Sequence, residues 1–264
     1  MHSKQNYIVI LILFLATVFI DWKTIDKNWI TDKCKGYTLW YTPNDKSYKK
    51  EYQKFIDNGI LSVNTFFNTS YNKEFNVFIH PSRQSLDSVW QKDWNMPEFK
   101  SECWMVASGV ATKLDMMSPK LWDKQSCEHI YSETIHTQQL ITHELFHVYH
   151  GQLNISPDFS NVEGIDWFVE GLATFASGQC DATRIAEIKK AISDKKNPNS
   201  LETFWTGKLK YGLSGSLVMY IDHKYGRNKL KELLPLNKKS ELLALLKTTE
   251  AQLLDEWQKY IQAL

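Results

Sequence analysis

Residues 140–151 read LITHELFHVYHG and contain three of the eight histidines in this chain of 264 residues. Two of them, His143 and His147, frame Glu144 in the pattern H-E-x-x-H. Residues four apart on an α-helix lie on one face, so both imidazoles can reach the same metal ion, with Glu144 beside its water. The apolar neighbours favour a helix, and Gly151 suits its C-terminal end. The stretch therefore predicts a metal-binding helix.

A catalytic zinc site needs a third protein ligand and an open position. The candidate lies in residues 166–179, DWFVEGLATFASGQ, where Glu170 falls early in a predicted helix. Gly171 would let this helix approach another one closely. Glu170 taken alone is a first-turn glutamate that complements the helix dipole, and Asp166 is an alternative ligand. Because Glu170 follows an H-E-x-x-H motif, we predict that Glu170 joins His143 and His147 as the third ligand of a Zn²⁺ ion.

The two motifs together resemble those of the gluzincin metallopeptidases, especially aminopeptidase-N-like enzymes and the broader peptidase MA-like group. In that family the third ligand is the glutamate of a W-x-x-E-G-x-A pattern, which Trp167, Glu170, Gly171 and Ala173 match. The resemblance covers residues 75–234. It implies an α+β, zincin-like fold, in which a small twisted mixed β-sheet lies over an active-site helix and a mostly helical C-terminal part follows.

The resemblance also implies the reaction, in which zinc and the general base Glu144 activate a water that attacks a peptide bond. Tyr211 is the candidate oxyanion donor, because residues 211–230 resemble the helix that follows in these enzymes; an ordinary core or surface tyrosine is an equal alternative. Aminopeptidase-N-like enzymes hold the substrate amine with a G-x-M-E-N segment, which residues 106–117 lack. We therefore expect an endopeptidase rather than an aminopeptidase, with a peptide or protein substrate held along residues 105–113.

Two alternatives remain open. One is a catalytically inactive zincin-fold protein that binds partners or acts as a scaffold in the cell envelope; the other is a non-enzymatic envelope protein with both histidines in its core. The metzincin pattern requires a glycine where this chain has His150 and a histidine where it has Leu153, so the sequence does not match that class. We interpret His150 as a cation at a helix C-terminus, with support of the metal site as the alternative, and His136 as a surface residue.

Residues 7–20 form an uninterrupted apolar run after Lys4. This predicts a signal peptide or an N-terminal membrane anchor over residues 1–21, and hence an exported protein that is secreted or membrane-attached. The net charge of +1 gives no support for a nucleic-acid partner. Oligomeric state is left open.

The four cysteines form no C-x-x-C pair, which argues against a structural zinc knuckle. A pairing of Cys103 with Cys127 is favoured because both flank the same central segment.

The pattern of apolar residues predicts strands first and helices afterwards, which is an α+β arrangement. One zincin-like domain is expected over residues 35–264, with its sheet in about 35–150 and its helical part in about 151–264. The predicted elements are a helix over 48–67, a strand over 75–80, a short helix over 82–94, one or two strands over 104–117 bent at Gly109, and helices over 134–150, 166–178, 182–193, 209–225, 227–234 and 238–262.

Overall fold

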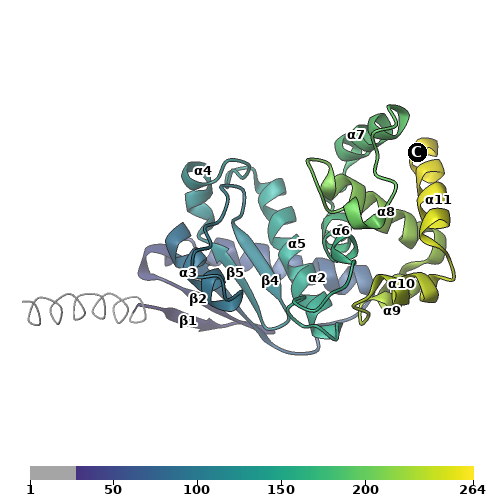
Figure 1. Cartoon of the computed structure of the whole chain (residues 1–264). Coiled ribbons are helices and arrows are strands. Elements are labelled where there is room, and N and C mark those ends of the chain that lie inside the picture. Colours follow the sequence, from purple (N-terminus) through teal and green to yellow (C-terminus); the bar gives the residue numbers. More distant parts are fainter. Residues whose placement is uncertain (1–27) are drawn as a thin grey trace, which may run out of the picture.

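The computed structural model describes residues 28–264, which form an α+β fold with one five-stranded mixed sheet and ten α-helices (Figure 1). The strands are β1 (Ile30–Lys33), β2 (Tyr37–Tyr41), β3 (Phe75–His80), β4 (Ala107–Val110) and β5 (Lys113–Met117). The helices are α2 (Lys49–Phe67), α3 (Arg83–Asp93), α4 (Trp122–Gln125), α5 (Thr134–Leu153), α6 (Asp166–Ala176), α7 (Ala182–Ser193), α8 (Lys210–Tyr225), α9 (Arg227–Leu233), α10 (Lys239–Leu246) and α11 (Glu250–Ala263).

The sheet has the strand order β1-β2-β3-β5-β4. The inner pairs β2–β3 and β3–β5 are parallel, whereas β1 and β4 run antiparallel to their neighbours at the two edges. β4 is joined to β5 by a two-residue turn at residues 111–112 and pairs with no other described strand. Its outer edge is therefore open to another extended chain.

Helix α2 packs against α5 across the sheet's helical face, and glycine makes their close approach feasible. A Cβ added at Gly59, in the middle of α2, would lie 2.5 Å from Cδ1 of Leu145. This glycine, which weakens the helix locally, is explained by the crossing of α2 over α5. The contact fixes the position of the helix that carries the H-E-x-x-H motif.

The C-terminal half is a group of helices packed beside α5, drawn in green to yellow in Figure 1. Helices α6 and α8 make the tightest approach, since a Cβ at Gly171 would lie 2.4 Å from the carbonyl oxygen of Ser214. The predicted role of Gly171 in close helix packing is confirmed.

Most predicted elements are present, with three differences. Strands β1 and β2 and the short helix α4 were not predicted, and the sheet begins at Ile30. The strand region 104–117 reverses at residues 111–112 rather than at Gly109. The helix predicted over 238–262 is two helices, separated where Lys247 adopts a left-handed conformation (φ 53°) and Thr249 starts α11 with a capping box.

The prediction of an exported chain, either secreted or anchored to the membrane by its N-terminal segment, is corrected. Within residues 28–264 no helix is long and apolar enough to cross a membrane, and no anchor is shown. The segment on which that prediction rested, residues 7–20 within the proposed leader or anchor 1–21, lies outside the described residues.

Candidate metal centre

Three side chains from two helices meet at one point. His143 and His147 project from adjacent turns of α5, with their Nε2 atoms 3.0 Å apart. One carboxylate oxygen of Glu170, from α6, lies 3.4 Å from Nε2 of His143 and 3.5 Å from Nε2 of His147. Both histidines are buried and Glu170 is partly exposed. These three residues could hold a metal ion.

The spacing of the three ligand atoms fits a small tetrahedral cation. Zinc binds imidazole nitrogen and carboxylate oxygen at about 2.0–2.2 Å, which places neighbouring ligand atoms of a tetrahedron roughly 3.3 Å apart. The observed separations of 3.0, 3.4 and 3.5 Å lie close to that value. Two nitrogens and one oxygen with an open fourth side are a common donor set for catalytic zinc.

Gln179 sets the orientation of one ligand. Its side-chain oxygen lies 2.8 Å from Nδ1 of His143, and because an amide oxygen can only accept, the imidazole donates from Nδ1. In the neutral ring this tautomer makes Nε2 of His143 the nitrogen that can bind a metal. Gln179 follows α6 after the turn at Gly178, whose positive φ of 82° suits glycine.

Glu144 points to the cleft from the same helix. Within residues 140–151 it is the one partly exposed residue. Burial is the largest influence on its carboxyl and raises the pKa to about 7; nearby Glu170 also raises it, whereas His143 and a hydrogen bond from the backbone N–H of Gly109 lower it. A carboxyl with a pKa near neutrality can both take up and release a proton.

The pKa of the Glu170 carboxyl is shifted in the opposite direction, downward. Burial favours its protonated form, but His147 and His143 outweigh burial and hold the pKa of Glu170 below its usual range. Glu170 is therefore a carboxylate at neutral pH, which is the form that binds a cation.

Strand β4 lies directly against α5 at this point. A Cβ at Gly109 would be 2.2 Å from the carbonyl oxygen of Glu144 and 3.1 Å from Cβ of His147. Only glycine permits this approach. The open edge of the sheet is thus brought beside the three candidate ligands.

The centre opens into a cleft of about 970 Å³ between β4 on one wall and helices α6 and α8 on the other. Tyr211, in the first turn of α8, lines this cleft, and its ring centroid is 6.2 Å from that of His143. Burial, and after it the charges of Glu170 and Glu144, raise the pKa of Tyr211, so its hydroxyl stays protonated. Tyr211 is therefore a neutral donor close to the centre.

Three other residues considered from the sequence do not belong to the three-residue cluster. Asp166 lines the cleft one helical turn before Glu170 and is not among the three converging ligands. His136 is exposed and paired with Glu133. His150 is fully buried, and burial lowers its pKa to about 3, so the interpretation as a helix-terminal cation is wrong. Its Nε2 lies 3.1 Å from the carbonyl oxygen of Leu234, which ties α5 to the end of α9.

Three residues at the cleft escaped the sequence reasoning. These are Gln179, Arg184 and Lys210, and none belongs to a motif of fixed spacing. The predicted disulfide between Cys103 and Cys127 is confirmed.

No protein-family model matches this chain, and no curated protein matches it.

Proposed function

We propose that this chain is a zinc-dependent peptidase of the gluzincin type. The observation that carries the proposal is the convergence of His143, His147 and Glu170 at tetrahedral spacing, in a cleft beside an open strand edge. Bound zinc would polarise the scissile carbonyl and lower the pKa of a water molecule. The resemblance of both motifs to gluzincin enzymes supports the same reaction.

The edge of β4 offers backbone groups to an extended substrate. The amide of Met117 donates to the carbonyl of Val106, so by antiparallel alternation Val106, Ser108 and Val110 face β5. Ala107 and Gly109 then direct their N–H and C=O groups to the open edge. A peptide added as a further strand would lie across the mouth of the metal centre.

Glu144 is placed to act as the general base. Its carboxyl lies next to the three ligands, and its pKa of about 7 lets it accept a proton from water and return that proton to the leaving amine. A cation in the centre would lower this raised pKa and keep Glu144 ionised before reaction.

Tyr211 supports the proposal as a donor to the oxyanion that forms from the carbonyl. Its protonated hydroxyl is on the α8 wall, across the cleft from β4. A donor fixed on the wall opposite the base stabilises charge that develops during the attack. We propose endopeptidase rather than aminopeptidase action, because no G-x-M-E-N segment is present to hold a substrate amine.

The alternative is an inactive zincin-fold binding or scaffold protein. Against it, both histidines, the base and the third carboxylate are all present in one arrangement. The two functions differ in one measurable property, since only the enzyme cleaves peptides.

The test begins with zinc per chain, measured by elemental analysis after reconstitution, for the wild type and Glu170→Ala. About one zinc in the wild type and weaker retention in Glu170→Ala are expected. The zinc-loaded proteins are then incubated with a peptide library and the products identified by mass spectrometry. Glu144→Gln should keep its zinc and lose roughly 10²- to 10⁴-fold in rate.

Two outcomes oppose the proposal in different ways. A wild type that retains no zinc would exclude the metallopeptidase. Zinc retention without cleavage of any library peptide would favour the inactive scaffold.

A further inference from the structure

One end of the cleft carries two cations that have no anionic partner within the described part of the chain, residues 28–264. Nζ of Lys210 lies 4.6 Å from the ring centroid of Trp104, 4.5 Å from that of Trp205 and 5.2 Å from that of Tyr211. The guanidinium carbon of Arg184 lies 6.0 Å from the Tyr211 ring. Within residues 28–264, neither cation lies within 4.0 Å of a carboxylate oxygen, and both line the cleft.

Several other half-buried cations within residues 28–264 have an anionic partner, although Arg83, Lys189 and Lys231 do not. Lys113 lies between Asp93 and Asp115, and Arg227 forms a fork with Asp222. Cations withdrawn from water normally acquire such partners because desolvation of an unpaired charge is costly.

The local contacts satisfy these two cations only in part. The aromatic rings around Lys210 stabilise its charge, yet they accept no ordinary hydrogen bond from its three N–H groups. Arg184 donates from one nitrogen to the backbone oxygen of Gln179, which leaves further donors of its five. Glu128, an exposed residue of the same cleft, is beyond ion-pair distance. The pair therefore has unused capacity to bind an anion.

The cations lie on a defined side of the metal centre. Both cations lie against the ring of Tyr211, whose centroid is 6.2 Å from that of His143. Trp104, which contacts Lys210, precedes the first residue of β4 by three positions, so the cations are at the N-terminal end of that strand. A peptide paired antiparallel with β4 directs its C-terminal residues to this end.

The opposite end of β4 has the opposite charge. There the amide of Ala111 donates to the carbonyl of Pro157, and Asp158 follows on the wall of the cleft. A peptide whose C-terminal part lies at the cations and whose N-terminal part lies at Asp158 matches this polarity.

We propose that Lys210 and Arg184 bind a carboxylate of the substrate, on the C-terminal side of the cleaved bond. This inference rests on the proposed peptidase function and specifies its substrate class. The carboxylate is either the C-terminal group of a short peptide or an Asp or Glu side chain. Since an extended residue spans about 3.3 Å, the group belongs to a residue roughly one to three places beyond the scissile bond.

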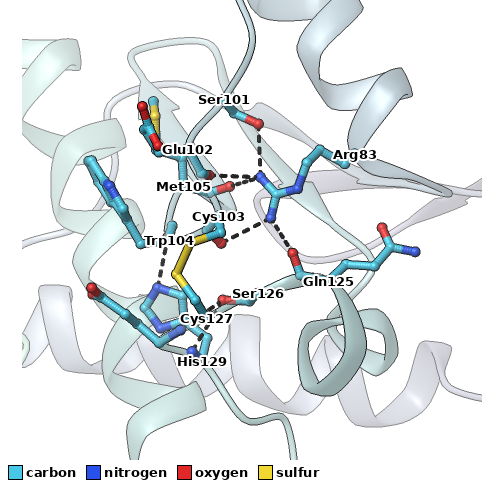
Figure 2. Close-up of a disulfide and its surroundings, with 11 residues drawn as sticks. Arg83, Ser101, Glu102, Cys103, Trp104, Met105, Gln125, Ser126, Cys127 and His129 are labelled. Carbon is cyan, nitrogen blue, oxygen red and sulfur yellow. Dashed lines mark hydrogen bonds between the residues drawn. A yellow bond between two sulfur atoms is a disulfide. The ribbon is translucent and has the colours of Figure 1, made fainter.

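The aromatic wall of this site is held in place before any ligand arrives. Figure 2 shows Arg83 donating to Ser101 and to the backbone oxygens of Glu102, Cys103, Met105 and Gln125.

A second set of contacts holds Trp104 itself. Nε2 of His129 lies 2.9 Å from the backbone oxygen of Trp104, beside the disulfide between Cys103 and Cys127 (Figure 2). A rigid wall lowers the entropy lost when a ligand binds.

The test measures binding, so it does not depend on turnover. The full chain, zinc-free and zinc-loaded, is titrated by ligand-observed NMR with three peptides: N-acetyl-Ala-Ala-Phe as the free acid, the same peptide as its C-terminal amide, and N-acetyl-Ala-Asp-Phe amide. The variants are Lys210→Met, Arg184→Met, Arg184→Lys and the double Met variant. Lys208→Met is the matched control, because Lys208 is exposed and two residues from Lys210.

One of the two peptides with a carboxylate should bind the wild type roughly tenfold more tightly than the uncharged amide. Preference for the free acid identifies the C-terminal group, and preference for the Asp peptide identifies a side chain. Lys210→Met and Arg184→Met should each reduce the preference and the double variant should abolish it, while affinity for the uncharged amide is unchanged. Arg184→Lys and Lys208→Met should retain the preference for the carboxylate. Melting temperatures verify that each variant is folded.

The inference is overturned if the wild type shows no preference for either carboxylate, or if the double variant keeps it. Peptide cleavage by zinc-loaded protein without a carboxylate preference would refute this inference and leave the proposed function standing. A preference that the double variant loses, in a protein that cleaves nothing, would refute the proposed function instead.

Discussion

Gln179 accepts a hydrogen bond of 2.8 Å from Nδ1 of His143, so the segment that follows α6 orients a candidate ligand carried by α5. The same helix α6 supplies Glu170. Helix α6 and its C-terminal turn thus contribute twice to the candidate centre, once as a ligand and once by fixing the tautomer of another. Loss of either contribution should weaken metal binding, by different amounts.

Substitution of Gln179 by Leu is expected to lower zinc affinity about 10- to 100-fold, because an unsupported imidazole loses its fixed tautomer and orientation. Competition with a chromophoric chelator measures this affinity. Gln179→Glu, which keeps an acceptor at the same place, should retain most of it. Equal affinity in wild type and Gln179→Leu would show that the hydrogen bond does not support the ligand.

Gly109→Ala should destabilise the fold by about 1–3 kcal/mol, because the added Cβ would meet a backbone oxygen that cannot move by a side-chain rotation. That oxygen belongs to Glu144 and would be 2.2 Å away. Urea unfolding gives the free energy. Ala107→Ser, on the same strand and partly exposed, is the control and should be close to neutral. A Gly109→Ala variant as stable as wild type would mean that β4 can move away from α5.

His150 should make the protein sensitive to acid. Burial lowers its folded pKa to about 3, whereas in the unfolded chain it is near 6.5. Below the unfolded value the unfolded state binds the extra proton, so stability is present above pH 6.5 and falls as the pH drops toward 3. Between pH 7 and pH 5 this one group lowers the free energy of unfolding by about 2 kcal/mol.

Urea unfolding of the wild type and His150→Gln at several pH values separates this contribution from that of other groups. The variant should lose less stability between pH 7 and pH 5 than the wild type does. Identical pH dependence in the two proteins would show that His150 does not titrate in this way.

Arg83→Lys should loosen the segment before β4, because an ammonium has three donors and cannot reproduce the fork that contacts five oxygens. We expect a loss of about 1–3 kcal/mol and faster proteolysis within residues 94–106. Lys100→Met, an exposed change in the same segment, is the control. If Arg83→Lys is cleaved by the protease as slowly as the wild type, the disulfide alone is enough to hold this segment in place.

Helices whose signals are local lie close to their predicted bounds. The spacing of apolar residues and the caps are properties of a few neighbouring residues, and α2, α7 and α8 lie within a residue or so of their predicted bounds. The break at Lys247 was missed because lysine is not a residue that normally marks a left-handed turn.

Strand β2 was missed for a different reason. Its sequence, YTLWY, is buried along nearly all its length between β1 and β3, so it lacks the polar alternation that identifies a half-exposed strand. Only the tertiary arrangement explains it.

The residues of the candidate site likewise fall into two groups, those that the sequence predicts and those that it does not. His143, Glu144 and His147 follow from helical spacing, and Glu170 followed from its motif. Gln179, Arg184 and Lys210 come to the cleft because of how loops and helix ends pack, and that packing leaves no pattern in the sequence.

The division of the ligand set between α5 and α6 has a consequence for how the chain could be taken apart. Two ligands precede the connection at residues 154–165 and the third follows it. A polypeptide cut within that connection would yield two pieces, neither with a full set of donors. If the centre binds a metal, high-affinity uptake would then require the two pieces to reassociate, and metal binding would report whether they are correctly joined.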